Sequence, residues 1–410
     1  MVWRGAASLF GVSFLLAGFL PAVAAIAQTS EDWDRCAGKN SPTLDQQIDS
    51  CTLVIRPGNV PSNNLALAYM GRGFAYITKG DFVRAIQDYD QAIRLNPSNA
   101  SAFNNRGLAN ASVGDIDHAL QDYNEAIRLA PTAFAFYNRG EAYAKKGDFD
   151  HAILDYDQAI ELNHNYAAAL LNRGFIYTTR GYYDRAIQDY DRAISLAPDV
   201  PLAFYNRGVA YAQKGDVDRA IQDYDHAIRL NPEDTWAYYR RGEAYVKKRD
   251  FVRAIEDYDQ TIRLNPVNAA AFNNRGFARA SQGDLDGALQ DYDQAIWLAP
   301  DFANAFYNRG SAFTERREFD RAIQDYDRAV RLDSNFARAF INRGFVYATK
   351  GEYDHAIQDF DEAIRLNPNY AEAFLNRGIA RLRRGDPIGG NADIAKAKLL
   401  DPSIAGYPIR

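Results

Sequence analysis

The chain has 410 residues, of which 47% are hydrophobic and 24% charged, and its formal net charge is −6. This composition is typical of a folded soluble protein and excludes an intrinsically disordered chain. Nucleic acids and anionic membrane surfaces both select basic protein faces. The negative net charge therefore predicts that neither is a partner.

Residues 1–27 have the features of a secretory signal peptide. A weakly basic start leads into an apolar run from Ala6 to Leu20. The sequence Ala25-Ile26-Ala27 then fits the small-x-small cleavage pattern. The apolar run is short for a membrane span of about 20 residues. We expect an exported protein, periplasmic or secreted, with no membrane span after cleavage; a retained N-terminal anchor is the alternative.

The two cysteines, Cys36 and Cys51, follow this segment. An even number of cysteines in an exported chain favours a disulfide bond. Closing this loop would stabilise the N-terminal end by about 3 kcal/mol in the chain-entropy model. Two buried thiols without a bond are the alternative.

An Arg-Gly pair recurs along the chain at a spacing of 34 residues, with one step of 33. The pairs are Arg72-Gly73, Arg106-Gly107, Arg139-Gly140, Arg173-Gly174, Arg207-Gly208, Arg241-Gly242, Arg275-Gly276, Arg309-Gly310, Arg343-Gly344 and Arg377-Gly378. A fixed period of this length is typical of stacked structural repeats. We number the repeats one to ten in this order.

Repeat five illustrates the predicted local structure. Residues 202–213 carry apolar side chains at helical spacing and predict a first helix. Lys214-Gly215-Asp216 supplies a basic last turn, a glycine stop and a cap for the next helix. Residues 218–230 predict a second helix, which Asn231-Pro232 ends. Because one such pair cannot bury its apolar surface alone, successive pairs are expected to stack.

A large aromatic residue recurs in the second helix. The positions are Tyr89, Tyr123, Tyr156, Tyr190, Tyr224, Tyr258, Tyr292, Tyr326 and Phe360. A ligand-binding aromatic stripe would place these rings at the surface. Large rings at this spacing usually pack in the core of a repeat protein, and we predict that position here.

The repeat resembles the tetratricopeptide repeat (TPR). The aromatic, Gly, Tyr, Ala, aromatic, Ala and Pro positions of that family match Phe204, Gly208, Tyr211, Ala220, Tyr224, Ala227 and Pro232. The match covers residues 66–404 in ten units. It implies an all-α fold, an α-solenoid in which antiparallel helix pairs stack into a right-handed superhelix.

The resemblance also implies a domain organisation. Residues 28–65 would form a degenerate capping repeat, with Cys36 on its first helix and Cys51 in the aromatic position of its second. Residues 66–404 would form the ten TPR units, and residues 405–410 a C-terminal tail. The disulfide would then staple the cap.

Each repeat carries an aspartate fifteen residues after its glycine, from Asp88 in repeat one to Asp393 in repeat ten. TPR units usually have leucine where this chain has the arginine of the Arg-Gly pair. The two changes therefore predict an Arg–Asp bridge between the two helices of each repeat. A row of catalytic carboxylates is the alternative.

Asparagine precedes this arginine in eight repeats. We call this set the asparagine row: Asn105, Asn138, Asn172, Asn206, Asn274, Asn308, Asn342 and Asn376. Tyrosine precedes it at Tyr137, Tyr205, Tyr239 and Tyr307. The resemblance implies that the row lines a concave groove and grips the backbone of an extended peptide. The alternative is that the amides satisfy groups within the array.

The sequence contains no motif for catalysis, a metal or a cofactor. His118, His151 and His355 share one position in the repeat, where other repeats have arginine, which favours a solvated face over a metal site. We therefore expect a scaffold for a protein or peptide partner and not an enzyme. The alternative is a structural or self-associating array with no groove ligand, in which the chain would form homo-oligomers.

Overall fold

The computed structural model describes residues 30–56 and 60–406, and the predicted signal peptide lies outside these ranges. The described residues form α-helices joined by short turns, with one 3-10 turn and no strand among them. This confirms the all-α solenoid. No helix within the described ranges is long and apolar enough to cross a membrane. The chain divides into two units, residues 1–214 and 215–410, which are described separately.

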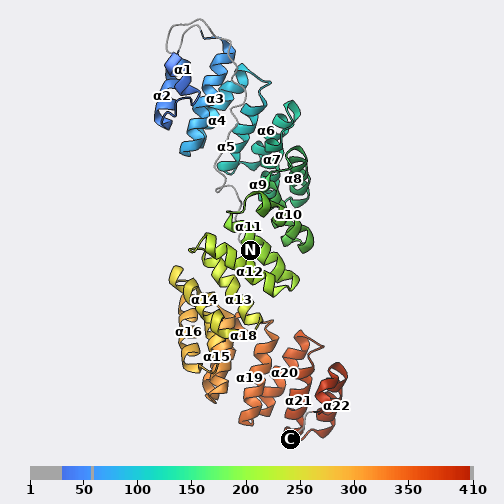
Figure 1. The fold of residues 1–410 in the computed structure, drawn as a ribbon. Coiled ribbons are helices and arrows are strands. Elements are labelled where there is room, and N and C mark those ends of the chain that lie inside the picture. The colour runs from blue at the N-terminus through green and yellow to red at the C-terminus, as the bar shows by residue number, and fades with distance from the viewer. Residues whose placement is uncertain (1–29, 57–59, 407–410) are drawn as a thin grey trace. The chain divides into compact units, whose positions relative to one another are not determined.

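In the first unit, successive helices pack against one another in chain order, from blue to green in Figure 1. The helices are α1 (Ser30–Cys36), α2 (Leu44–Ile55), α3 (Ser62–Lys79), α4 (Phe82–Leu95), α5 (Ala100–Ser112), α6 (Ile116–Leu129), α7 (Ala133–Lys146), α8 (Phe149–Leu162), α9 (Ala167–Thr179), α10 (Tyr183–Leu196) and α11 (Pro201–Lys214). Helix α3 begins before residue 66, and the predicted boundary between cap and first repeat stays a prediction.

The second unit repeats this arrangement, from yellow-green to red in Figure 1. Its elements are α12 (Val217–Leu230), α13 (Thr235–Lys247), α14 (Phe251–Leu264), α15 (Ala269–Ser281), α16 (Leu285–Leu298), α17 (Ala303–Glu315), α18 (Phe319–Leu332), α19 (Ala337–Lys350), α20 (Tyr353–Leu366), α21 (Ala371–Arg384), α22 (Pro387–Leu400) and the 3-10 turn η2 (Pro402–Gly406).

The turn between the two helices of a repeat follows the predicted signals. Gly147 takes a left-handed backbone with φ of 82°, which ends α7. The Asp148 side chain then accepts a hydrogen bond from the backbone N–H of His151 and caps α8. These two contacts reverse the chain within two residues, so the helices of a repeat pack side by side.

The recurring aromatic residues fill the core, as predicted. All nine side chains are at most 2% exposed. The repeat glycine permits this packing, since a Cβ built on Gly107 would lie only 2.8 Å from Cε1 of Tyr123. The first helix therefore approaches the ring too closely for any side chain at this position.

The N-terminal cap contains the predicted disulfide between Cys36 and Cys51. Both cysteines are buried and pack with Val54 and Ala68. Gly71 lies against them, because a Cβ at this residue would come within 2.6 Å of the Cys36 carbonyl oxygen. The cap thus occupies the space that an asparagine side chain takes in later repeats, which explains why repeat one interrupts the asparagine row.

Replacing Cys36 and Cys51 together with alanine is expected to destabilise the cap by about 3 kcal/mol, the loop-closure entropy of a cross-link of about 15 residues. Hydrogen exchange should show faster opening of α1 and α2, with α8 protected as before. Thiol labelling of the denatured, unreduced protein should find no reactive cysteine, and two labelled thiols would contradict the bond.

Candidate functional site

The arginine of each Arg-Gly pair binds an aspartate on the second helix of its own repeat. Arg309 Nε donates to Asp325 Oδ2 at 2.8 Å, and Nη2 donates to Asp325 Oδ1 at 2.7 Å. The Asp325 side chain is 7% exposed, so water is largely excluded from the bridge. The other pairs described are Arg72–Asp88, Arg106–Asp122, Arg139–Asp155, Arg173–Asp189, Arg241–Asp257, Arg275–Asp291, Arg343–Asp359 and Arg377–Asp393. They confirm the predicted Arg–Asp bridge.

The same guanidinium group also binds the preceding repeat. Arg309 Nη1 donates to Asp293 Oδ1 at 2.6 Å, and Asp293 directly follows the core residue Tyr292. Equivalent bonds are Arg106–Asp90, Arg173–Asp157, Arg207–Asp191, Arg241–Asp225, Arg275–Asp259, Arg343–Asp327 and Arg377–Asp361. This second contact was not predicted, although the recurring Asp-Tyr-Asp triplet was its signal.

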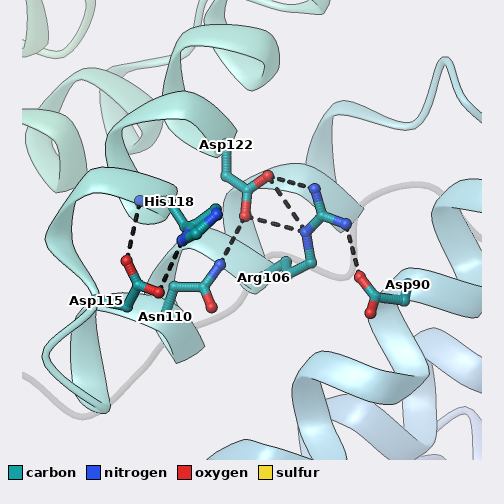
Figure 2. Close-up of polar contacts among 6 residues, drawn as sticks. All are labelled: Asp90, Arg106, Asn110, Asp115, His118 and Asp122. Atoms are coloured by element: carbon teal, nitrogen blue, oxygen red, sulfur yellow. Dashed lines mark hydrogen bonds and ion pairs between the residues drawn. The ribbon is translucent and has the colours of Figure 1, made fainter.

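Figure 2 shows one such arginine between its two aspartates. Arg106 lies between Asp122 of its own repeat and Asp90 of the repeat before, and Asn110 Nδ2 donates to Asp122 at 3.0 Å. Repeat three differs because Arg139 Nη1 meets the neutral acceptor Asn124 Oδ1, at 2.7 Å. The contact between repeats two and three is therefore a hydrogen bond without a second full charge.

Burial and hydrogen bonding shift the pKa values of both partners in these bridges. It raises the pKa of the Asp325 carboxyl above its ordinary value, although the bonds with Arg309 oppose the rise. Burial acts to lower the pKa of Arg309, but the bonds with Asp325 and Asp293 outweigh it and raise that pKa. The guanidinium also lies over the ring of Phe306, 5.6 Å from its centroid. The arginine is thus held charged and fixed in one position.

A second set of ion pairs joins neighbouring repeats at the protein surface. Lys350 Nζ lies 2.7 Å from Asp320 Oδ1, and the aspartate side chain is 81% exposed. Arg316 pairs in the same way with Asp286, and Arg384 with Asp354. Exposed pairs of this kind contribute only about 0–1 kcal/mol each.

The asparagine row makes contacts between successive first helices. Asn172 Nδ2 donates to Tyr137 Oη at 3.2 Å, and Asn342 Nδ2 donates to Tyr307 Oη at 3.1 Å. The structure therefore brings these asparagines and tyrosines together in pairs, one repeat apart. This arrangement agrees with the alternative in which the amides satisfy groups within the array.

Three further asparagines of the row also donate to the preceding repeat. Asn274 donates to Tyr239 at 3.0 Å. Where the preceding repeat lacks the tyrosine, an asparagine accepts instead: Asn138 donates to Asn104 at 3.1 Å and Asn308 to Asn273 at 2.9 Å. The acceptors Asn104 and Asn273 were not selected from the sequence.

The two units differ in how far the row is covered. Asn105, Asn138 and Asn172 are 4–8% exposed in the first unit, and Tyr137 is 7% exposed. Asn206 and Tyr205, on the last helix of the first unit, are half-buried. So are the members in the second unit: Asn274, Asn308, Asn342, Asn376, Tyr239 and Tyr307. A ligand can therefore reach the row more readily in the second unit.

Four aromatic side chains on the first helices are exposed. Trp236 and Phe134 are 37% and 38% exposed, and Phe277 and Phe345 are 43% and 50% exposed. Phe277 and Phe345 each follow a row asparagine by three residues and so lie one helical turn along from it. The Trp236 ring contacts the Tyr239 ring, with centroids 6.2 Å apart. We call the asparagine row, its tyrosines and these four rings, taken separately in each unit, the first-helix surface.

Repeats three and six carry a glutamate one turn after the row tyrosine. Asn172 Nδ2 lies 3.3 Å from Glu141 Oε1, and no cation is within ion-pair distance of Glu141 among the described residues. Burial raises the pKa of the Glu141 carboxyl, with Tyr137 and Lys145 opposing the rise. In repeat six, Arg240 Nη1 lies 2.7 Å from Glu243 Oε2, so that carboxylate has a cationic partner.

The histidines take the solvated position that was predicted. His118 Nδ1 lies 2.7 Å from Asp115 Oδ2, at the start of α6 (Figure 2). His151 pairs in the same way with Asp148. In the ranges that the structure describes, no group of three or more His, Cys, Asp or Glu side chains could hold a metal ion.

Family models for this repeat match most of the chain between residues 73 and 370. Models described as "Tetratricopeptide repeat" match residues 100–132, 133–166, 174–238, 239–301 and 337–370, and one described as "TPR repeat" matches 73–114 and 310–351. The chain belongs to the tetratricopeptide-repeat family. TPR proteins are typically scaffolds for protein or peptide partners and typically lack catalytic activity. This chain is accordingly a protein-interaction scaffold.

Several solved TPR structures are similar to the chain. A tetratricopeptide repeat protein from Parabacteroides merdae is 21% identical, with a TM-score of 0.45 over 60% of this chain and 98% of its own. Cut9–Hcn1 of the APC/C is 13% identical, with a TM-score of 0.49 over 89% of this chain and 91% of its own. YrrB, described as a TPR protein with an unusual peptide-binding site, is 24% identical, with a TM-score of 0.38 over 45% and 95%. No curated protein matches the sequence.

Changing Asp325 to alanine is expected to destabilise the unit of residues 215–410 by about 3–5 kcal/mol, because Arg309 stays buried without its bidentate partner. Arg309→Ala should cost a similar amount, and the double variant should cost less than the sum of the two. Urea unfolding measures all three. Asp320→Ala, which removes an exposed pair, is the control and should cost about 0–1 kcal/mol. Additive losses would contradict the bridge.

Changing Glu141 to glutamine is expected to raise the melting temperature at pH 7. Because the folded state raises the pKa of Glu141, its ionisation opposes folding as pH rises through that pKa. The gain should therefore disappear in acid, where the wild-type carboxyl is protonated in both the folded and the unfolded state. Glu243→Gln is the control and should give no gain, since it removes an ion pair. A lower melting temperature for Glu141→Gln would contradict this account.

Proposed function

We propose that the chain binds an extended segment of a partner protein along the first-helix surface, outside the cytoplasm. The observation that carries the proposal is the position of two exposed rings one helical turn from half-buried asparagine amides. They are Phe277 beside Asn274 and Phe345 beside Asn342, on first helices two repeats apart. The described arginines of the Arg-Gly pairs are committed to bridges, so this surface is mostly uncharged. It suits a ligand that offers backbone amides and apolar side chains.

The asparagine amides in the second unit can hydrogen-bond to a peptide backbone. Asn342 and Asn308 each donate through Nδ2 to the preceding repeat. The Asn274 oxygen already accepts from Asn273 Nδ2. The amide oxygens of Asn308 and Asn342 are then the groups that would accept from a peptide N–H. Because such a contact involves only the ligand backbone, it would tolerate many ligand sequences.

The exposed rings would supply the side-chain contacts. Phe277 and Phe345 each stand one helical turn from a row asparagine, and Trp236 contacts a row tyrosine. Aromatic side chains have few rotatable bonds, so they bury apolar area at a low cost in conformational entropy. The second unit carries three of the four exposed rings and the more accessible amides, and we propose it as the main contact.

The proposed location depends on the sequence of residues 1–27 and on the disulfide. A bond between Cys36 and Cys51 is typical of proteins in an oxidising compartment. N-terminal sequencing of the native protein tests the export. Gln28 as the first residue would support it, and an intact N-terminus in the cytoplasm would contradict it.

Changing Phe277 and Phe345 together to serine is expected to reduce capture of cross-linked partners about tenfold, because two exposed rings are worth about 1–2 kcal/mol in contact area. Cross-linking pull-down from the native compartment measures this. About half of each ring is buried and Phe277 contacts Phe251, so the melting temperature should fall slightly while the chain stays folded.

The matched control changes Trp297 and Leu399 to serine. These side chains are 73% and 74% exposed but lie on second helices. Capture should stay at the wild-type level in this control. Equal capture by both double variants would contradict binding at the first-helix surface, and recovery of the chain's own copies alone would favour the self-associating array.

A further inference from the structure

A carboxylate and several tyrosines lie together in repeat three. The Tyr137 ring is 4.9 Å from the Tyr166 ring and 5.9 Å from the Tyr156 ring, measured between centroids. The negative charge of Glu141 contributes to a raised pKa of Tyr166, after the larger effect of burial. Asn172 Nδ2 lies within 3.3 Å of both Tyr137 Oη and Glu141 Oε1, which places Glu141 beside Tyr137, and Glu141 is half-buried on α7.

The polar groups at this place are not fully satisfied. The Tyr156 hydroxyl is completely buried and has no hydrogen-bond partner among the described residues. Burial raises its pKa, the charge of Glu141 adds to the rise and Asn172 opposes it. Glu141 itself accepts from Asn172, but this amide is neutral. The negative charge is thus partly desolvated without a cation in contact.

Repeat six provides a comparison within the same chain. Tyr239, Glu243 and Asn274 occupy the positions of Tyr137, Glu141 and Asn172, and Asn274 donates to Tyr239 as Asn172 does to Tyr137. In repeat six, however, Arg240 precedes the glutamate by three residues and binds it. The corresponding residue in repeat three is Asn138, which donates to Asn104. Repeat six supplies its own cation and repeat three does not.

Two further features separate the repeats. Lys145 lies one turn beyond Glu141, but it is exposed and outside ion-pair distance. Tyr166 adds a second ring beside Tyr137, whereas repeat six has Asn268 at this position. Tyrosine faces attract cations through the ring quadrupole, and the attraction grows when the site is desolvated.

We propose that Glu141, with Tyr166, binds a lysine or arginine side chain of the partner segment, while the buried Tyr137 ring holds Tyr166 in place. The carboxylate pairs with the cation, and the half-buried Tyr166 ring contacts its aliphatic stem and charged head. The site rests on the proposed function in one respect only, that the cation belongs to a partner lying on the first-helix surface. It adds that this partner carries a basic residue at the point that meets repeat three.

The test uses two small probes, N-acetyl-lysine N-methylamide and its neutral isostere N-acetyl-norleucine N-methylamide. Binding to the full chain is measured by saturation-transfer NMR, with competition to count sites. The lysine probe should bind at one site and at least about tenfold more tightly than the norleucine probe, the ratio expected for one charge-assisted contact. Glu141→Gln should abolish this preference, and the variant is expected to fold because it removes a desolvated charge.

Two variants in repeat six complete the design. Glu243→Gln should leave probe binding unchanged, because Arg240 already neutralises that carboxylate. Arg240→Asn copies repeat three and should create a second, weaker site that lacks the Tyr166 ring. Circular dichroism checks the fold of each variant.

Equal binding of both probes, or lysine binding that survives Glu141→Gln, would overturn the proposal. So would a full-strength second site in the unmodified chain at Glu243. These outcomes are independent of partner capture. If the Phe277 and Phe345 variants still capture partners while the probe preference depends on Glu141, the cation site stands and the first-helix surface fails.

Discussion

In most repeats one arginine binds two aspartates, one in its own repeat and one in the repeat before. Arg309 binds Asp325 through two parallel hydrogen bonds and Asp293 through a third. Because the inner aspartate is almost fully buried, this contact fixes how the two helices of a repeat lie against each other. The outer aspartate belongs to the preceding repeat, so the same side chain also fixes the step between repeats. TPR units usually have an apolar residue at this place, and its replacement by arginine adds directional bonds to the packing.

This interaction determines what the first helices present to a partner. The arginine charge is directed toward the second helices and is neutralised there. The neighbouring positions on the first helix carry amides, phenols and exposed rings instead. Glu141 is the exception within the first unit, since its charge has no ion-pair partner among the described residues. Arg240 neutralises the equivalent Glu243, so Glu141 lacks a cation that the chain supplies in repeat six.

Much of this architecture could be predicted from the sequence. The 34-residue period placed the helices of repeat five, predicted at residues 202–213 and 218–230, to within one residue of those observed. The intra-repeat bridge was predicted because both residues recur in every unit. The contact to Asp293 was missed because a repeat pattern does not show which copies meet across the step between repeats. The sequence also did not show which asparagine amides form hydrogen bonds within the array. Asn342, for example, donates to Tyr307, which lies one repeat before it. The glycine at position 71, where later repeats carry asparagine, could not be explained from the sequence either. The structure explains it, because the disulfide-bonded cap packs against this residue.

The central claim is that the arginines make neighbouring repeats unfold together. The most direct test is urea unfolding of a chain in which Asp293, Asp327 and Asp361 are changed to asparagine, compared with one in which Asp286, Asp320 and Asp354 are changed. The first set removes the charge that each arginine shares with the preceding repeat, and the second removes the same number of exposed charges on the same helices. The account predicts that unfolding of the second unit becomes broader, with a smaller denaturant slope, only in the first chain. Identical transitions in the two chains would contradict it.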